Sequence, residues 1–183
     1  LKCFAVYGHK INTWTRKKKN RMTKRIIIKN ARLNVPEKLG KDACVICEGG
    51  KIRHIETGPV TEEDASKIID AKGNYVYTGV KDMHTHGAGG HDSMDNTIAA
   101  YIGAAEAHAR YGTTSLVPTT LTSTWEELFH TFDIYKEAKK ANTKGASFLG
   151  LHLEGPYFSY NQRGAQDPPY LRNPLPEEYN AIL

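Results

Sequence analysis

The sequence predicts an α/β protein in which a small β-sheet segment precedes the first part of a (β/α)8 barrel. Short β-branched runs separated by turn residues fill residues 25–74, a pattern typical of a small sheet. From residue 75 onward, strand-like runs alternate with segments of helical periodicity, which is typical of parallel α/β architecture. Two of the later strands end in histidine or glutamate, side chains that can bind a metal ion, followed by glycine. The catalytic face of a barrel is built from the carboxyl ends of its strands.

Composition favours a globular protein without a membrane or nucleic-acid partner. The 183 residues are 39% hydrophobic, and no apolar run approaches the roughly 18 residues that a membrane span needs. The net charge of +5 arises in residues 1–25, which hold nine basic groups, whereas the rest of the chain holds 16 basic and 20 acidic groups. Because the chain begins at Leu1 and Met22 directly precedes the first strand-like run, we expect residues 1–24 to be a basic leader that is disordered or not native.

Residues 25–74 are predicted to form the small β domain. Strands are expected at residues 26–28, 43–48, 51–56 and 67–70, with Gly49 and Gly50 as a hairpin turn. Cys44 and Cys47 form a C-x-x-C pattern, but residues three apart on a strand face opposite sides. We therefore predict buried, inert thiols, and three cysteines without a secretion signal suit a reducing cytoplasm.

Residues 75–183 are predicted to form three β/α units of an incomplete barrel. Strands are expected at residues 75–86, 114–118 and 147–153. Helices are expected from Asn96 or Thr97 to about residue 111, from Ser123 or Thr124 to about residue 141, and from Pro176 onward. Lys81 falls on the helix-facing side of the first strand, so we expect it either to reach solvent or to destabilise the chain.

Histidine and glutamate side chains mark the ends of two of these strands. His84 and His86 are two residues apart and project from the same side of one strand. Glu154 ends another strand, so the three side chains are expected to meet. His152 lies deeper on the face of Glu154, where a hydrogen-bonding role is the stronger expectation. His91 follows a glycine-rich loop that could approach substrate or only turn the chain.

Two motifs carry a resemblance to a known family. The first is D-M-H-T-H-G-A-G-G-H-D-S-M-D from Asp82, and the second is H-L-E-G-P from His152, followed by G-A-Q-D-P from Gly164. From Arg25 to its end, the chain resembles the N-acetylglucosamine-6-phosphate deacetylases of the amidohydrolase superfamily. The resemblance implies a metal-dependent hydrolase barrel that is preceded by a β-sandwich segment.

The resemblance also implies the chemistry. The substrate would be N-acetylglucosamine 6-phosphate, hydrolysed to glucosamine 6-phosphate and acetate by a cytoplasmic homo-oligomer. His84, His86 and Glu154 would bind one or two divalent ions, with zinc as the expected metal, and Ala165 and Gln166 would contact the sugar. The proton-shuttling aspartate and further histidines would lie beyond residue 183, so we expect the isolated chain to be inactive, weakly metal-binding and poorly soluble.

Two other functions stay open at this point. Another amidohydrolase, acting on a cyclic amide, would share His84 and His86 but is not expected to combine H-L-E-G-P with G-A-Q-D-P. A truncated, non-catalytic product would at most bind metal or a partner.

Overall fold

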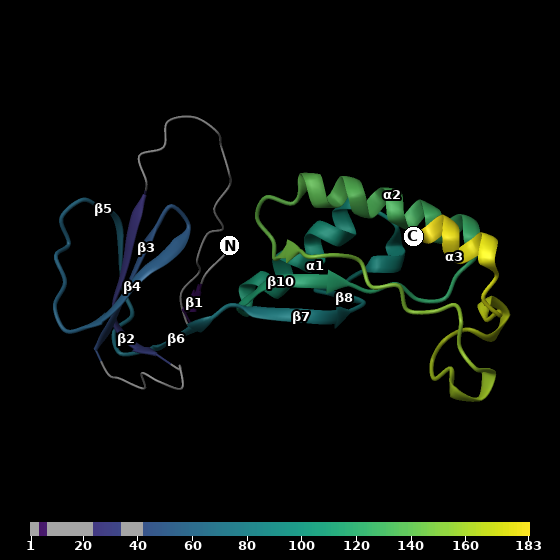
Figure 1. Cartoon of the computed structure of the whole chain (residues 1–183), viewed down its shortest axis with the longest axis horizontal. Helices are drawn as coiled ribbons and strands as arrows, with labels where there is room; N and C mark the ends of the chain where they lie inside the picture. The colour runs from purple at the N-terminus through teal and green to yellow at the C-terminus, as the bar shows by residue number, and fades with distance from the viewer. Residues whose placement is uncertain (1–3, 7–23, 34–41) are drawn as a thin grey trace. The chain divides into compact units, whose positions relative to one another are not determined.

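The structure, a computed structural model, describes residues 4–6, 24–33 and 42–183 (Figure 1). The chain divides into two units, one made mainly of residues up to Lys81 and the other mainly of residues from Asp82 onward. The short segments His108–Ser115 and Thr143–Ala146 group with the first unit. Most of the predicted basic leader lies outside the described residues, so that expectation stays a prediction.

Among the residues that the structure describes, the sheet of the first unit has six strands in the order β1-β6-β2-β3-β4, with β5 beside β2. Their bounds are β1 (Phe4–Val6), β2 (Arg25–Leu33), β3 (Ala43–Glu48), β4 (Lys51–Thr57), β5 (Ala65–Asp70) and β6 (Tyr75–Thr78). The predicted hairpin turn is confirmed, since Gly49 and Gly50 join β3 to β4 with φ of 58° and 78°. Glycine adopts such angles without steric cost.

Alternation along β2 and β3 places apolar side chains on both faces of the sheet. One cluster contains Ile28 and Val45 together with Cys47, and a separate cluster contains Ile27 with Cys44. The two cysteines are therefore buried on opposite faces, as predicted. Burial raises the pKa of the Cys44 thiol, which keeps this sulfur protonated and unreactive at neutral pH.

The remaining chain alternates strands and helices. The bounds are β7 (Val80–Thr85), β8 (Gly87–Ala88), β9 (His91–Asp92), α1 (Ile98–Arg110), β10 (Thr113–Pro118), α2 (Trp125–Ala141), β11 (Ser147–Phe148) and α3 (Pro176–Ile182). Three short 3-10 turns lie at Ser93–Asp95, Tyr160–Gln162 and Pro168–Tyr170. The mixed α/β class is thus confirmed, whereas closure of a barrel and the sandwich stay predictions.

Side-chain caps start two helices where the sequence predicts them. The Thr97 hydroxyl accepts the Ala100 N–H at 3.1 Å at the start of α1. Thr124 and Glu127 form a reciprocal capping box at the start of α2. Such caps satisfy the N–H groups that the first helical turn leaves without partners.

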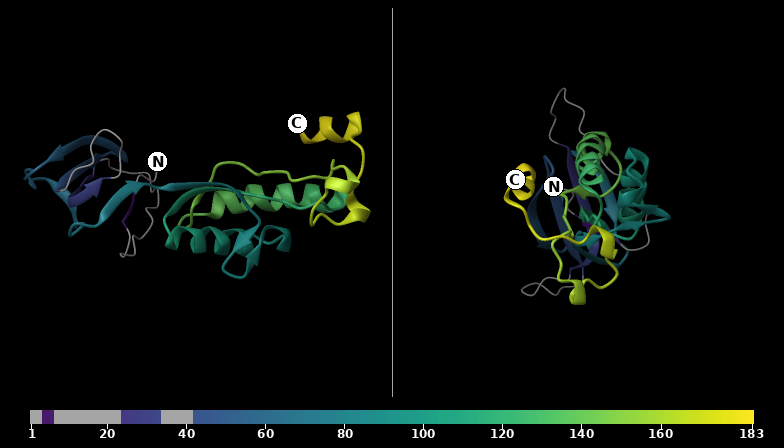
Figure 2. Two further views of the ribbon diagram at one scale, coloured as in Figure 1. Left: turned by 90° about the horizontal axis from the view of Figure 1, so that it is seen from below. Right: turned by 90° about the vertical axis from the view of Figure 1, so that its right-hand side faces the viewer.

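Helices α1 and α2 lie side by side (Figures 1 and 2). The ring of Tyr101 on α1 lies 6.0 Å from that of Tyr135 on α2 and 6.1 Å from that of Phe148 on β11. These aromatic contacts join both helices to the three-stranded sheet, whose order is β11-β10-β7. Within the described residues, no helix is long and apolar enough to cross a membrane.

Two strand predictions are wrong in detail. The single strand predicted for residues 75–86 is two strands separated at Gly79, because β6 pairs with β1 and β2 whereas β7 belongs to the sheet with β10. The strand predicted for residues 147–153 is regular only over Ser147–Phe148, followed by an isolated bridge between Thr119 and His152.

Lys81 is exposed, so its ammonium avoids the cost of burial.

Candidate metal centre

The side chains of His84, His86 and Glu154 converge where β7 ends and just beyond the bridge between Thr119 and His152. Glu154 Oε2 lies 3.4 Å from His84 Nε2 and 3.0 Å from His86 Nε2, and the two Nε2 atoms are 3.3 Å apart. Among the histidine, cysteine, aspartate and glutamate side chains of the described residues, these three lie close enough together to share a metal ion.

Local backbone structure explains this convergence. His84 lies on β7 and His86 directly follows it, so the alternation of the strand turns both rings to one side. Glu154 follows His152, which forms a parallel bridge with Thr119 just after β10. In the sheet, β10 lies between β7 and β11. The histidine pair therefore reaches the end of β10 from the side of β7, and the Glu154 carboxylate reaches the same end from the side of β11.

The donor set fits a divalent cation. Glu154 Oε2 is buried without a hydrogen-bond partner, and so is His86 Nδ1. The Nε2 atoms of His84 and His86 are 3.3 Å apart. If both imidazoles are neutral and both Nε2 lone pairs face each other, the lone pairs repel unless a proton or a cation lies between them. Two imidazole nitrogens and one carboxylate oxygen are ligands typical of catalytic zinc sites, which leave a coordination position open for water or substrate.

His152 lies next to this group without belonging to it. Its ring is 5.0 Å from that of His84 in an edge-to-face arrangement, and its Nδ1 is buried without a partner. His91 packs on α1, where a Cβ at Gly103 would overlap its ring. The His91 ring therefore lies against the helix, although the residue is exposed.

The two residues predicted to contact the sugar differ in exposure. Ala165 is exposed, whereas Gln166 is buried and its Oε1 accepts the Thr122 N–H at 2.9 Å. This bond fixes one end of the loop that follows Glu154 to the segment that follows β10.

Sequence reasoning missed a charged cluster that holds the same loop. Glu178 on α3 is buried, accepting from Arg172 Nε at 2.6 Å and from the Tyr157 hydroxyl at 2.8 Å. Arg172 also donates to the Ser123 carbonyl at 3.1 Å. Burial, and then the Glu178 carboxylate, raise the pKa of Tyr157 to about 12. No local sequence pattern marks these residues, because the loop between them brings them together.

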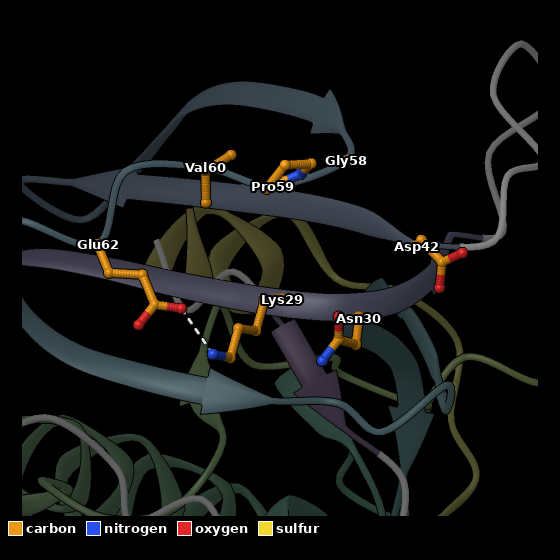
Figure 3. Close-up of a pocket in the computed structure, with 7 residues that line it drawn as sticks. All are labelled: Lys29, Asn30, Asp42, Gly58, Pro59, Val60 and Glu62. Carbon is orange, nitrogen blue, oxygen red and sulfur yellow. Dashed lines mark hydrogen bonds and ion pairs between the residues drawn. The ribbon is translucent and has the colours of Figure 1, made fainter.

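A hollow of about 390 Å³ in the first unit offers no comparable chemistry (Figure 3). Its cation, Lys29, is already paired with Glu62 at 2.6 Å, and its other lining residues include Pro59 and Val60. The histidine–glutamate group in the second unit is therefore the candidate site.

Comparisons with known proteins agree with the motifs. No family model matches the sequence. The chain is similar to N-acetylglucosamine-6-phosphate deacetylase of Homo sapiens, with 35% identity over 156 residues that cover 76% of this chain and 38% of the relative. It is also similar to N-acetylgalactosamine-6-phosphate deacetylase of Escherichia coli O157:H7, with 34% identity over 125 residues that cover 67% of this chain and 31% of the relative.

A solved structure supports the same relationship. The structure is similar to that of N-acetylglucosamine-6-phosphate deacetylase from Pasteurella multocida, with a TM-score of 0.76 and 27% identity, covering 86% of this chain and 41% of that one. The chain spans about two fifths, or less, of the length of the curated relatives that it matches. By sequence and by fold, the chain belongs to the N-acetylglucosamine-6-phosphate deacetylase family.

Proposed function

We propose that this chain supplies metal-binding strands to a cytoplasmic deacetylase that hydrolyses the acetamide of N-acetylglucosamine 6-phosphate to glucosamine 6-phosphate and acetate. The observation that carries the proposal is the approach of His84 Nε2 and His86 Nε2 to the buried Glu154 Oε2, within 3.4 Å. The relatives, which are named for deacetylation of phosphorylated amino sugars, support the choice of substrate.

His84, His86 and Glu154 would hold the ion in this proposal. Zinc is the proposed metal, because mixed imidazole and carboxylate ligands suit it. A divalent ion held there would polarise the acetamide carbonyl and lower the pKa of nearby water towards 7. The Glu154 carboxylate would balance part of the charge of the ion, and the two imidazoles would fix its position against the sheet.

Ala165 and Gln166 would contact the sugar in this proposal. The buried amide of Gln166 is held by the Thr122 N–H at 2.9 Å, which supports a role for a rigid loop beside the ligands. The proton for the leaving amine is assigned, by family resemblance, to an aspartate of the whole protein. General acid help of this kind contributes about 10²–10⁴ in rate.

The proposal is tested with the protein expressed from its complete coding sequence. We expect acetate release from N-acetylglucosamine 6-phosphate that is lost on chelation and restored by zinc, together with much slower release from unphosphorylated N-acetylglucosamine. N-acetylgalactosamine 6-phosphate and a cyclic amide complete the panel. Preference for the cyclic amide, or equal rates with and without the phosphate, would refute the proposed substrate. Light scattering of the same protein checks the proposed homo-oligomer.

A further inference from the structure

Strand β10 is followed by two threonines that lie between the ligand-bearing segments. Thr119 and Thr120 are each 0% exposed. Thr119 bonds to Thr85, which stands between His84 and His86, and Thr120 bonds to the segment that ends in Glu154. Because buried polar groups nearly always have hydrogen-bond partners, the partners of these two hydroxyls define what they do.

The Thr119 side chain holds the histidine-bearing strand. Its Oγ1 accepts the Thr85 N–H at 3.1 Å and donates to the Val117 carbonyl at 3.3 Å. Its own N–H donates to the Thr85 carbonyl at 2.8 Å. One threonine thus binds both backbone polar groups of the residue between the two histidines, and this fixes the direction in which their Cα–Cβ bonds point.

The Thr120 side chain holds the glutamate-bearing segment in the same way. Its N–H donates to the His152 carbonyl at 3.0 Å, and its Oγ1 accepts the Glu154 N–H at 3.3 Å. In a regular parallel ladder a backbone carbonyl of the neighbouring strand accepts such an N–H. Here a side-chain hydroxyl takes its place, at the residue that carries the carboxylate.

We infer that Thr119 and Thr120 are positioning residues of the metal centre, which fix the spacing between the histidine pair and the Glu154 carboxylate through two backbone amides. This role rests on the metal centre proposed above. Valine has almost the same shape as threonine but accepts no hydrogen bond, so Thr120→Val would leave the Glu154 N–H buried without a partner. Glu154 would then be free to move away from the imidazoles.

The test compares three variants of the protein expressed from its complete coding sequence. Thr120→Val removes the hydroxyl, and Thr120→Ser keeps it. Thr122→Val is a matched control, because the Thr122 residue is only 7% exposed and its Oγ1 has no hydrogen-bond partner. Two readouts are used: amide hydrogen exchange by NMR in the metal-free protein, and titration with cobalt(II) followed by its visible absorption.

In Thr120→Val we expect the Glu154 amide to exchange about fivefold faster, as for the loss of one hydrogen bond. The Leu149 amide, which donates to the Leu116 carbonyl at 3.0 Å, should keep its rate. Cobalt affinity should fall about 10- to 100-fold, the usual effect of losing a group that orients a metal ligand. Thr120→Ser and Thr122→Val should keep both the exchange rate of the Glu154 amide and the cobalt affinity.

Two results would overturn the inference. The first is equal acceleration of the Glu154 and Leu149 amides, which would mean general destabilisation. The second is cobalt affinity in Thr120→Val equal to that of the Thr122→Val control. Wild-type protein from the complete coding sequence that binds no cobalt would instead refute the metal centre itself, and with it the positioning role.

Discussion

Replacing Glu154 by glutamine should weaken cobalt(II) binding by the protein from its complete coding sequence about a hundredfold. The substitution keeps the length and hydrogen-bonding shape of the side chain and removes its charge. Glu154 Oε2 lies 3.0 Å from His86 Nε2, so a cation bound by both atoms would lie no farther than about 3 Å from the carboxylate oxygen. At that separation a single positive charge and the carboxylate charge interact by about 5 kcal/mol at an effective dielectric constant near 20.

Solvent screening reduces this figure. The Glu154 side chain is 25% exposed and that of His86 is 34% exposed, so we retain roughly half of the energy, about 3 kcal/mol, which corresponds to about a hundredfold in affinity. A doubly charged ion interacts more strongly than a single charge, which makes this value a lower bound.

Cobalt titration, monitored by visible absorption, measures the effect. Glu137→Gln is the control, because it removes an equal charge from an exposed position on α2, where Glu137 pairs with Lys140 at 2.6 Å. The reasoning fails if Glu154→Gln and Glu137→Gln bind cobalt with the same affinity as the wild-type chain.

Three further predictions follow from the same structure. Replacing His84 and His86 together by alanine should remove about one metal equivalent from the intact enzyme, since the pair supplies two of the converging ligand atoms; elemental analysis of both proteins checks this. Gly87→Ala should lower the melting temperature markedly, because its Cβ would overlap the backbone of β9, whereas Gly150→Ala has open space and should not. Burial and a carboxylate raise the pKa of Tyr157 from 10.0 to about 12. The folded chain therefore binds more protons between those pH values, and its stability falls as the pH rises through them; Tyr157→Phe should reduce that fall in urea unfolding measured at pH 9 to 12.

The convergence of the candidate ligands could be predicted from the sequence because it depends on local geometry. The period of two along a strand turns His84 and His86 to one side wherever the strand lies. The ends of parallel strands meet at one edge of a sheet, so Glu154 at the end of another strand could be placed with them. Helix starts at Thr97 and Thr124 were predictable for the same reason, since a cap is formed within a few residues.

Features that depend on a partner distant in sequence could not be predicted. Residues 75–86 keep a strand-like composition throughout, yet the partner strands change at Gly79. A Cβ at Gly79 would overlap the side chain of Thr114, so close packing between strands explains the glycine. The bond between Gln166 and Thr122 joins residues 44 apart in the sequence, and no periodicity reports such a contact.

The failed strand prediction and the positioning threonines have one physical origin. A continuous parallel ladder through residues 147–153 would use backbone carbonyls as acceptors and keep neighbouring strands evenly spaced along their length. At Thr120 a hydroxyl group replaces such a carbonyl as the acceptor of the Glu154 N–H, and the strand pairing ends at the bridge of His152, just before Glu154. Local departures from the pattern that the rest of a sequence obeys are expected at functional sites. The fully buried Thr120 hydroxyl accepts the Glu154 N–H and can therefore fix the position of this one residue without a continuous strand. The interruption of the strand is thus itself an argument that Glu154 is held for function.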